Sequence, residues 1–349
     1  MQQRRREMFD AAELAVVLSH YHLGVIESIT EFNRGSSGSP KVGIVAERGK
    51  FVLKRRAAER ANPERVNFAH QVQTHLADRG FPLAKLILTR DRADSVVRLR
   101  DHAYELFEFI AGEPFQKTVS EAYDAGMVLA RFHEATEDVV MPVSLKSLRG
   151  DYHDGAGVRT GLCSIESTLS SHESFVGNED ELSELVQSLL GTYDKAAGEA
   201  NRLGVNSRPE RIVHLDWHPG NILFRKQRVA AVVDYDSVRQ SKLVLDAANG
   251  ALQFSIIAGG DPATWPDELD QERFDAFLGG YESLIALTEP EHLCVPHLMV
   301  EALIAECVPP ITRTGTVGRW AGYRVLQMAR RKVSWIIAHA QRLTAKGRS

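Results

Sequence analysis

The stretch that decides the fold is residues 212–236, which read IVHLDWHPGNILFRKQRVAAVVDYD. The first part is predicted to be a loop, because Pro219 and Gly220 interrupt regular structure. The second part contains the apolar run 229–233, VAAVV, which is predicted to be a short buried strand. The sequence therefore predicts a polar loop that leads into a strand of the core.

Oxygen-bearing side chains hold fixed positions in this stretch. The loop carries the carboxylate of Asp216 and, five residues later, the amide of Asn221. The strand ends at Asp234, eighteen residues after Asp216, and Asp236 follows. In kinase-type phosphoryl transfer, one Asp takes up the proton of the substrate hydroxyl while an Asn and a second Asp hold Mg²⁺. The spacing favours such a site over the simpler interpretation, a polar turn between two core strands.

The pattern His-x-Asp-x-x-x-x-Asn at residues 214–221, followed by Asp-x-Asp at 234–236, resembles the aminoglycoside phosphotransferase, homoserine kinase and choline kinase superfamily. These proteins are small-molecule relatives of the protein kinases. The resemblance implies an α+β, two-lobed protein-kinase-like fold. It implies a small antiparallel-sheet lobe over residues 1–109, which binds the nucleotide phosphates, and a large, mostly helical lobe over residues 110–349.

The resemblance also implies the roles of individual residues. ATP and Mg²⁺ are the expected cofactors, with ATP between the lobes. Asp216 is the expected catalytic base, and Asn221 and Asp234 are the expected metal ligands, with Asp236 as a further candidate. His214 and His218 are expected to brace the loop.

A glycine- and serine-rich turn, NRGSSGSP at residues 33–40, separates two predicted strands near the N-terminus. Such a turn brings backbone N–H groups close to phosphates, because glycine has no side chain in the way. It matches neither the Walker pattern nor the full G-x-G-x-x-G pattern, so an ordinary hairpin turn remains the alternative. The candidate phosphate-binding residues are Gly35, Ser36, Ser37 and Gly38.

Lys54 ends the apolar strand 51–54 and resembles the third-strand lysine of kinases, which pairs with the α- and β-phosphates. We expect Arg55 and Arg56, which follow, to be exposed. The next helix is predicted to begin after Asn62. Glu64 is the only carboxylate between Glu59 and Asp78, so it is the candidate partner of Lys54 on this helix.

The segment 106–114, LFEFIAGEP, looks like the hinge between lobes. The resemblance puts adenine against the backbone of Phe107 and Phe109, where an extended edge leaves donors and acceptors unpaired. A buried strand that ends at a turn is the alternative.

Four features of the second half complete the expectations. Residues 141–180 show weak periodicity and are expected to be a mobile segment that closes over the acceptor. Asp246 is expected to cap a helix. Glu301 and Glu306 face either the substrate groove or, as the simpler expectation, water. Residues 308–349 contain nine Lys or Arg and no acid, which predicts the wet face of a helix or, alternatively, an anion site or a contact with an acidic subunit.

Composition limits the classes of function. The chain has 349 residues, 44% hydrophobic and 25% charged, with a net charge of −4, so nothing indicates a nucleic-acid partner. Its three cysteines form no CxxC pair, which fits a reducing compartment. With no clear signal peptide or membrane span in the sequence, we expect a cytoplasmic protein without a membrane partner.

The sequence predicts a kinase whose acceptor is a hydroxyl of a small metabolite: an amino acid, an amino alcohol, a sugar or an aminoglycoside. Two alternatives stay open. One is a Ser/Thr protein kinase, although the Arg of H-R-D, the D-F-G motif and the A-P-E motif are all missing. The other is a non-catalytic pseudokinase-type binding protein, although every base and metal position is retained.

Overall fold

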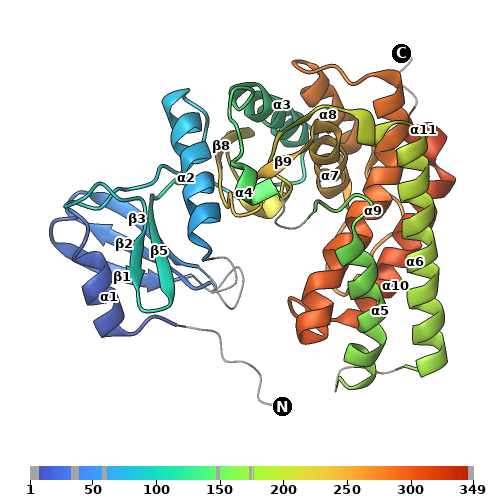
Figure 1. Cartoon of the computed structure of the whole chain (residues 1–349), viewed down its shortest axis with the longest axis horizontal. Coiled ribbons are helices and arrows are strands. Elements are labelled where there is room, and N and C mark those ends of the chain that lie inside the picture. Colours follow the sequence, from blue (N-terminus) through green and yellow to red (C-terminus); the bar gives the residue numbers. More distant parts are fainter. Residues whose placement is uncertain are drawn as a thin grey trace. The chain divides into compact units, whose positions relative to one another are not determined.

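The computed structural model describes residues 8–32, 39–56, 61–146, 150–172, 175 and 177–344 (Figure 1). The chain divides into two compact units. The first, called the sheet unit here, comprises Met1–Glu113, Leu223–Arg225 and Ala230–Ser237. The second, the helical unit, comprises Pro114–Ile222, Lys226–Val229 and Val238–Ser349.

The sheet unit is built on a five-stranded antiparallel sheet in the order β1-β2-β3-β5-β4. Alternating burial along β2 directs Val42, Ile44 and Ala46 into a core that also receives Val17 and Leu18 of α1. The strands are β1 (Ile26–Glu31), β2 (Lys41–Ala46), β3 (Gly49–Arg55), β4 (Val97–Leu99) and β5 (His102–Glu108).

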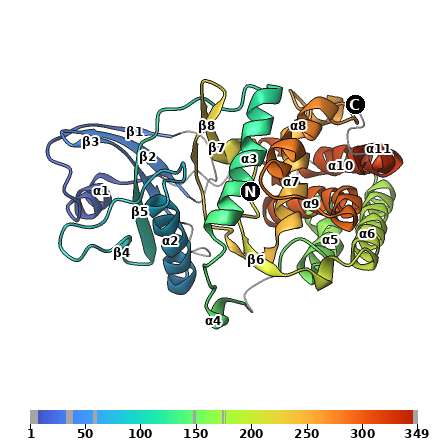
Figure 2. The ribbon, with the colours of Figure 1, turned by 90° about the horizontal axis from the view of Figure 1, so that it is seen from above.

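Capping residues fix both helices of the sheet unit. Helix α1 (Ala11–Leu18) begins with a capping box in which Asp10 and Glu13 bond to each other's backbone N–H groups. Helix α2 (Pro63–Asp78) begins at Asn62, whose side chain accepts from the Arg65 N–H, as the sequence predicts. In both ribbon views α2 lies beside β5 (Figures 1 and 2). Residues 83–88 form no strand, and Leu83 and Leu86 take part in isolated bridges only.

The helical unit is built around α9, against which α5, α6, α7 and α10 pack. Helices α3 and α8 form a second closely packed pair. The helices are α3 (Val119–Ala135), α4 (Val143–Lys146), α5 (Ala156–Ser170), α6 (Glu179–Arg202), α7 (Leu243–Ser255), α8 (Gln271–Glu282), α9 (Glu289–Thr314), α10 (Gly322–Ala338) and α11 (Ala340–Thr344).

Short strands complete the second half of the chain. Strands β6 (Glu210–Val213) and β9 (Arg239–Lys242) pair antiparallel. Strands β7 (Ile222–Arg225) and β8 (Arg228–Val232) pair with each other, and β10 (Thr316–Val317) pairs with β11 (Trp320–Ala321). Strand β8 lies almost where the sequence predicts it, and it leads directly to Asp234.

Residues 141–180 are more regular than the sequence suggests. They contain α4 and the fifteen-residue helix α5, which buries Leu162, Ile165 and Leu169. Helix α5 has no side-chain N-cap and no acid in its first turn, so the usual start signals are missing.

Helix α9 is long and apolar enough to meet the length and composition test for a membrane span. However, 78% of its apolar window is buried inside the structure. Its apolar residues therefore form part of the core of the helical unit.

Candidate functional site

The loop that carries Asp216 is held by a buried carboxylate in the helical unit. Asp246 accepts hydrogen bonds from the backbone N–H groups of His214, at 2.5 Å, and Leu215, at 2.6 Å. Leu215 has a φ of 56°, in the left-handed region that is costly for a side chain of this kind. The two bonds from Asp246 stabilise this conformation. The expectation that Asp246 caps a helix is wrong, since Lys242 occupies the N-cap of α7.

Aromatic packing fixes the same loop from behind. The His214 ring is fully buried and contacts Phe132 and Trp217 edge-on, with ring centroids 5.9 and 5.4 Å away. His133 joins Asp246 at 3.1 Å and the Tyr281 hydroxyl at 3.0 Å. The backbone at residues 214–215 is therefore held by both hydrogen bonds and dense packing.

Asp216 and Asn221 are joined directly. The Asn221 amide nitrogen donates to the Asp216 backbone carbonyl at 3.0 Å and to its Oδ2 at 2.8 Å. His218 accepts from the Gly220 N–H, and its Nε2 lies 3.5 Å from Asp216 Oδ1. Asn221 is buried, whereas the Asp216 side chain is 39% exposed. The loop thus presents one accessible carboxylate from a fixed backbone.

Lys54 is the centre of a charge cluster in the sheet unit. Its ammonium lies 3.1 Å from Asp234 Oδ1 and 2.9 Å from Asp236 Oδ2. Burial alone would lower the pKa of Lys54, but Asp234 and Asp236 together raise it above its usual value. Asp234 has a φ of 68°, so its backbone is strained where the buried strand ends. Lys41 on β2 is the register partner of Lys54 on β3. Burial lowers the pKa of Lys41, and the charges of this cluster also act on it.

Arg56 extends the cluster to a fully buried glutamate. It contacts Glu105 at 2.8 Å and Asp236 at 2.7 Å, and His70 of α2 binds the same Glu105 oxygen. Burial would raise the pKa of Glu105, but His70, Arg56 and Lys54 lower it. The carboxylate is therefore ionised at neutral pH.

Two expectations about this region need correction. Glu64 is exposed in the first turn of α2, and the described contacts of Lys54 are with aspartates, so Glu64 is not its partner. Arg55 and Arg56 are buried rather than exposed, and Arg55 pairs with Glu13 of α1 at 2.7 Å. The partners of Lys54, which are Asp234 and Asp236, and the partner of Arg55, which is Glu13, are all distant in sequence. Local sequence patterns therefore do not reveal these ion pairs.

The candidate nucleotide-binding backbone is only partly as expected. The Phe109 N–H donates to the Lys50 carbonyl at 2.9 Å, so this donor is not unpaired. Phe107 lies within β5 opposite Val52 and also forms a bridge with Leu86. The expectation that Phe107 and Phe109 lie on an extended edge with unpaired backbone groups is therefore wrong. The other candidates, Gly35, Ser36, Ser37 and Gly38, lie outside the described residues.

Each unit offers one of the predicted oxygen donors for Mg²⁺, Asn221 in the helical unit and Asp234 in the sheet unit. Asp234 is 21% exposed at its side chain, and Asn221 uses its amide nitrogen toward Asp216, so its oxygen is the end left for a cation. Among the residues described, no group of three or more His, Cys, Asp or Glu could hold a metal by itself. A carboxylate or an amide oxygen is by itself a donor that Mg²⁺ accepts, because this ion commonly takes one or two protein oxygens plus phosphate oxygens and water.

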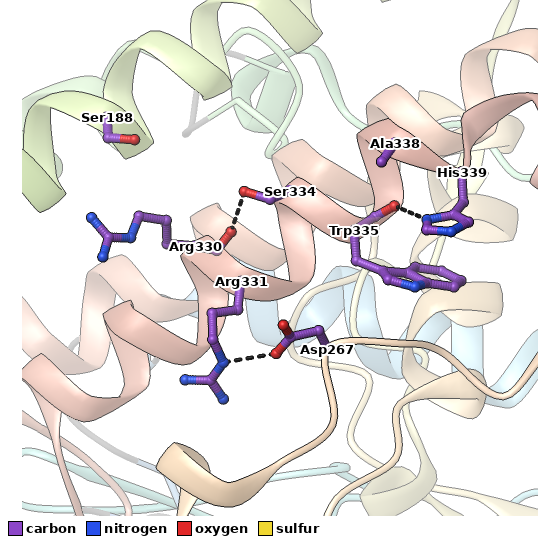
Figure 3. A pocket seen from close by; sticks show the side chains of 8 residues that line it. All are labelled: Ser188, Asp267, Arg330, Arg331, Ser334, Trp335, Ala338 and His339. Atoms are coloured by element: carbon purple, nitrogen blue, oxygen red, sulfur yellow. Dashed lines mark hydrogen bonds and ion pairs between the residues drawn. The ribbon is translucent and has the colours of Figure 1, made fainter.

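A depression on the helical unit lies at α10, and its lining includes Arg330 and Arg331 of the basic C-terminal segment (Figure 3). Arg331 in its lining binds Asp267 at 2.7 Å, and Arg324 outside it binds Asp261. Lys332 is fully buried and donates to the Pro266 carbonyl at 2.6 Å. These cations anchor the 261–268 loop, so the C-terminal basic residues are not simply the wet face of a helix. The lining residues are Ser188, Asp267, Arg330, Arg331, Ser334, Trp335, Ala338 and His339.

Solved structures share this fold over almost the whole chain. A microcompartment-associated aminopropanol kinase has a TM-score of 0.69 at 16% identity, covering 96% of this chain and 99% of that one. An aminoglycoside phosphotransferase from Alicyclobacillus acidocaldarius has a TM-score of 0.65 at 16% identity, covering 98% of each chain. The expected α+β fold, with an antiparallel-sheet lobe and a mostly helical lobe, is confirmed.

Curated relatives are homoserine kinases. The one from Caulobacter sp. (strain K31) is 28% identical over 225 residues, which cover 64% of this chain and 63% of the relative. The match thus spans less than two thirds of that relative's length. The homoserine kinase of Caulobacter vibrioides is 25% identical over 289 residues, 82% of each chain.

The sequence profile of the phosphotransferase enzyme family (APH) matches residues 28–291, which include the Asp216 loop and the Lys54–Asp234 cluster. The superfamily that the motif spacing resembles is confirmed by this match. The chain belongs to the phosphotransferase enzyme family.

Proposed function

We propose that this protein is an ATP-dependent kinase that moves the γ-phosphate to a hydroxyl group of a small metabolite. The observation that carries the proposal is the accessible Asp216 carboxylate, which Asn221 and the Asp246-braced backbone hold in one position. A preorganised carboxylate of this kind suits a general base, because its geometry is set before the substrate arrives.

In the proposed reaction, Asp216 accepts the proton of the acceptor hydroxyl as that oxygen attacks the γ-phosphorus. The new O–P bond forms, the bond between the γ-phosphorus and the β–γ bridging oxygen breaks, and ADP leaves with that electron pair. The product is a phosphate monoester, and the proton on Asp216 returns to solvent.

Asn221 and Asp234 would hold Mg²⁺, which when bound supplies positive charge to the phosphate oxygens. Lys54 forms ion pairs with Asp234 and Asp236, and its positive charge suits the α- and β-phosphates of ATP. Burial holds this lysine in one place, so its charge acts without a large loss of side-chain entropy.

A small acceptor is favoured over a protein. The relatives that match are homoserine kinases, and the structural neighbours include an aminopropanol kinase and an amicoumacin kinase. Homoserine, amino alcohols, sugars and aminoglycosides are therefore the acceptors to try first.

The test is a screen of ADP release over these acceptors with Mg-ATP, repeated with Asp216→Asn. This variant keeps the shape of the side chain and removes its basicity. We expect turnover to fall about 10²–10⁴-fold, the usual worth of a positioned general base. The melting temperature and the affinity for ATP should change little. If the variant folds, binds ATP and turns over like the parent, Asp216 is not the base.

A further inference from the structure

A second carboxylate, Glu306, lies near Asp216 within the helical unit and has no part in the proposed chemistry. It belongs to α9, which packs against α7. Two amides of α7, at positions 249 and 253, lie one helical turn apart and reach it. Gln253 donates to Glu306 Oε2 at 2.5 Å, and the Asn249 side chain also hydrogen-bonds to Glu306.

The charged group within electrostatic reach that acts most on Glu306 is another carboxylate, that of Asp216. Glu306 is exposed, and the surrounding protein and then the negative charge of Asp216 raise the pKa of its carboxyl above the ordinary value. Tyr152 and Cys307 are also within electrostatic reach, and neither offers a positive charge. In the part of the chain that the structure describes, no Lys, Arg or His pairs with Glu306.

An independent sign comes from Asn249. It is 3% exposed, and its Oδ1 has no hydrogen-bond partner among the described residues. A buried acceptor without a donor costs free energy, and such groups in native proteins usually have a functional reason. The side chain that carries this oxygen also acts on the Glu306 carboxyl, so both acceptors belong to one cluster of polar groups.

A protonated amine suits these acceptors better than a metal ion does. An ammonium group carries three N–H donors and one positive charge, which match a carboxylate and a buried amide oxygen. Both hydrogen-bonded amides already occupy lone pairs of Glu306.

We propose that Glu306, together with Asn249 and Gln253, binds the ammonium group of the acceptor while the acceptor hydroxyl faces Asp216. This assignment rests on the proposed function. It narrows the acceptor to hydroxylated amines, so sugars and polyols without an amine are excluded as substrates of choice.

The experiment compares acceptors with and without an amine in the wild type, Glu306→Gln and Glu289→Gln. The last is a matched control, an exposed carboxylate in the first turn of the same helix. The probes are L-homoserine and 1-amino-2-propanol, with 4-hydroxybutyrate and 1,2-propanediol as their amine-free counterparts. ADP release at saturating Mg-ATP is measured against acceptor concentration.

We expect Glu306→Gln to raise the KM for the amine acceptor about tenfold or more, the worth of one charge-assisted hydrogen bond. The KM for ATP and the weak activity on the amine-free acceptor should stay at wild-type values, and Glu289→Gln should behave as the wild type. Equal KM values for the amine in Glu306→Gln and Glu289→Gln overturn the inference.

The two proposals fail in different ways. If the wild type phosphorylates the amine-free acceptors as well as the amines, the kinase function stands and the role of Glu306 is wrong. If no acceptor causes ADP release, the proposed function is wrong. Calorimetric titration of L-homoserine and 1-amino-2-propanol then decides the inference: weaker binding to Glu306→Gln supports it, and unchanged or absent binding overturns it.

Discussion

At the scale of single residues, the sheet unit depends on charges that are buried in a connected set. Glu105 is fully buried and touches both Arg56 and His70, and Arg56 continues to Asp236. Each member offsets the cost of burying its neighbour, so removing one leaves another charge without compensation. The contribution of Glu105 depends on pH because its carboxylate can be protonated, whereas Arg56 stays charged throughout.

The pH dependence of stability tests this set. The folded state lowers the pKa of Glu105 below its ordinary value of 4.5. Its contribution is therefore complete above that value and is lost as the pH falls through the lower, folded pKa. We expect Glu105→Gln to lower the thermal midpoint clearly at pH 7, and the gap from the wild type to narrow below pH 4.5. A gap that stays constant between pH 7 and pH 3 would mean that the ionised form of Glu105 adds no stability.

At the scale of elements, helices α3 and α8 pack with their backbones in close approach. A Cβ added to Gly280 would lie 2.0 Å from the Tyr123 carbonyl oxygen, and one added to Gly126 would lie 2.0 Å from that of Phe277. Only glycine permits this spacing. Helix α3 also carries His133, a contact of the Asp246 carboxylate, so the packing of this pair supports the Asp216 loop.

Neighbouring glycines of α8 provide a matched comparison. We expect Gly280→Ala to lower the free energy of unfolding by about 1–3 kcal/mol, because the helices must move apart. A Cβ on Gly279 meets nothing within 4 Å. Gly279→Ala should therefore be neutral or stabilise by up to about 1 kcal/mol through its better helix propensity. Urea unfolding followed by circular dichroism measures the free energy of unfolding of both variants. Equal losses of stability would show that the close helix approach does not require a glycine at position 280.

What the sequence could predict also differs between elements. A helix with a side-chain cap can be predicted from its sequence, as for α2, which begins after Asn62. Helix α5 cannot be predicted in the same way, because its start has no side-chain cap and its sequence is rich in Ser, Thr and Gly. Among site residues, the Asp216–Asn221 pair is encoded by a five-residue spacing. The contacts of Asp246 and Glu105 link residues 31 or more apart, and no local pattern encodes them.

At the scale of the whole molecule, the candidate residues are divided between the two units. Asp216, Asn221 and Glu306 belong to the helical unit, and Lys54 and Asp234 belong to the sheet unit. The chain changes unit several times between residues 222 and 238, directly after the Asp216 loop. A ligand that binds only the folded state adds its binding free energy to the stability of the folded protein.

The stabilisation of the whole chain by ATP, with and without metal, tests whether Asp234 takes part in binding Mg²⁺. At a ligand concentration of 100 times Kd, binding to the folded state adds about 2.7 kcal/mol to its stability. We expect Mg-ATP to raise the thermal midpoint clearly, and ATP with a chelator to raise it less. Asp234→Asn should remove the metal-dependent part. Its fold should persist, because Asp236 still pairs with Lys54 at 2.9 Å.

Asp267→Asn, which alters an aspartate paired with Arg331 on the helical unit, should respond like the wild type. Equal stabilisation with and without metal, or a full metal response in Asp234→Asn, would remove Asp234 from the metal site and leave the assignment of Lys54 to be tested by itself.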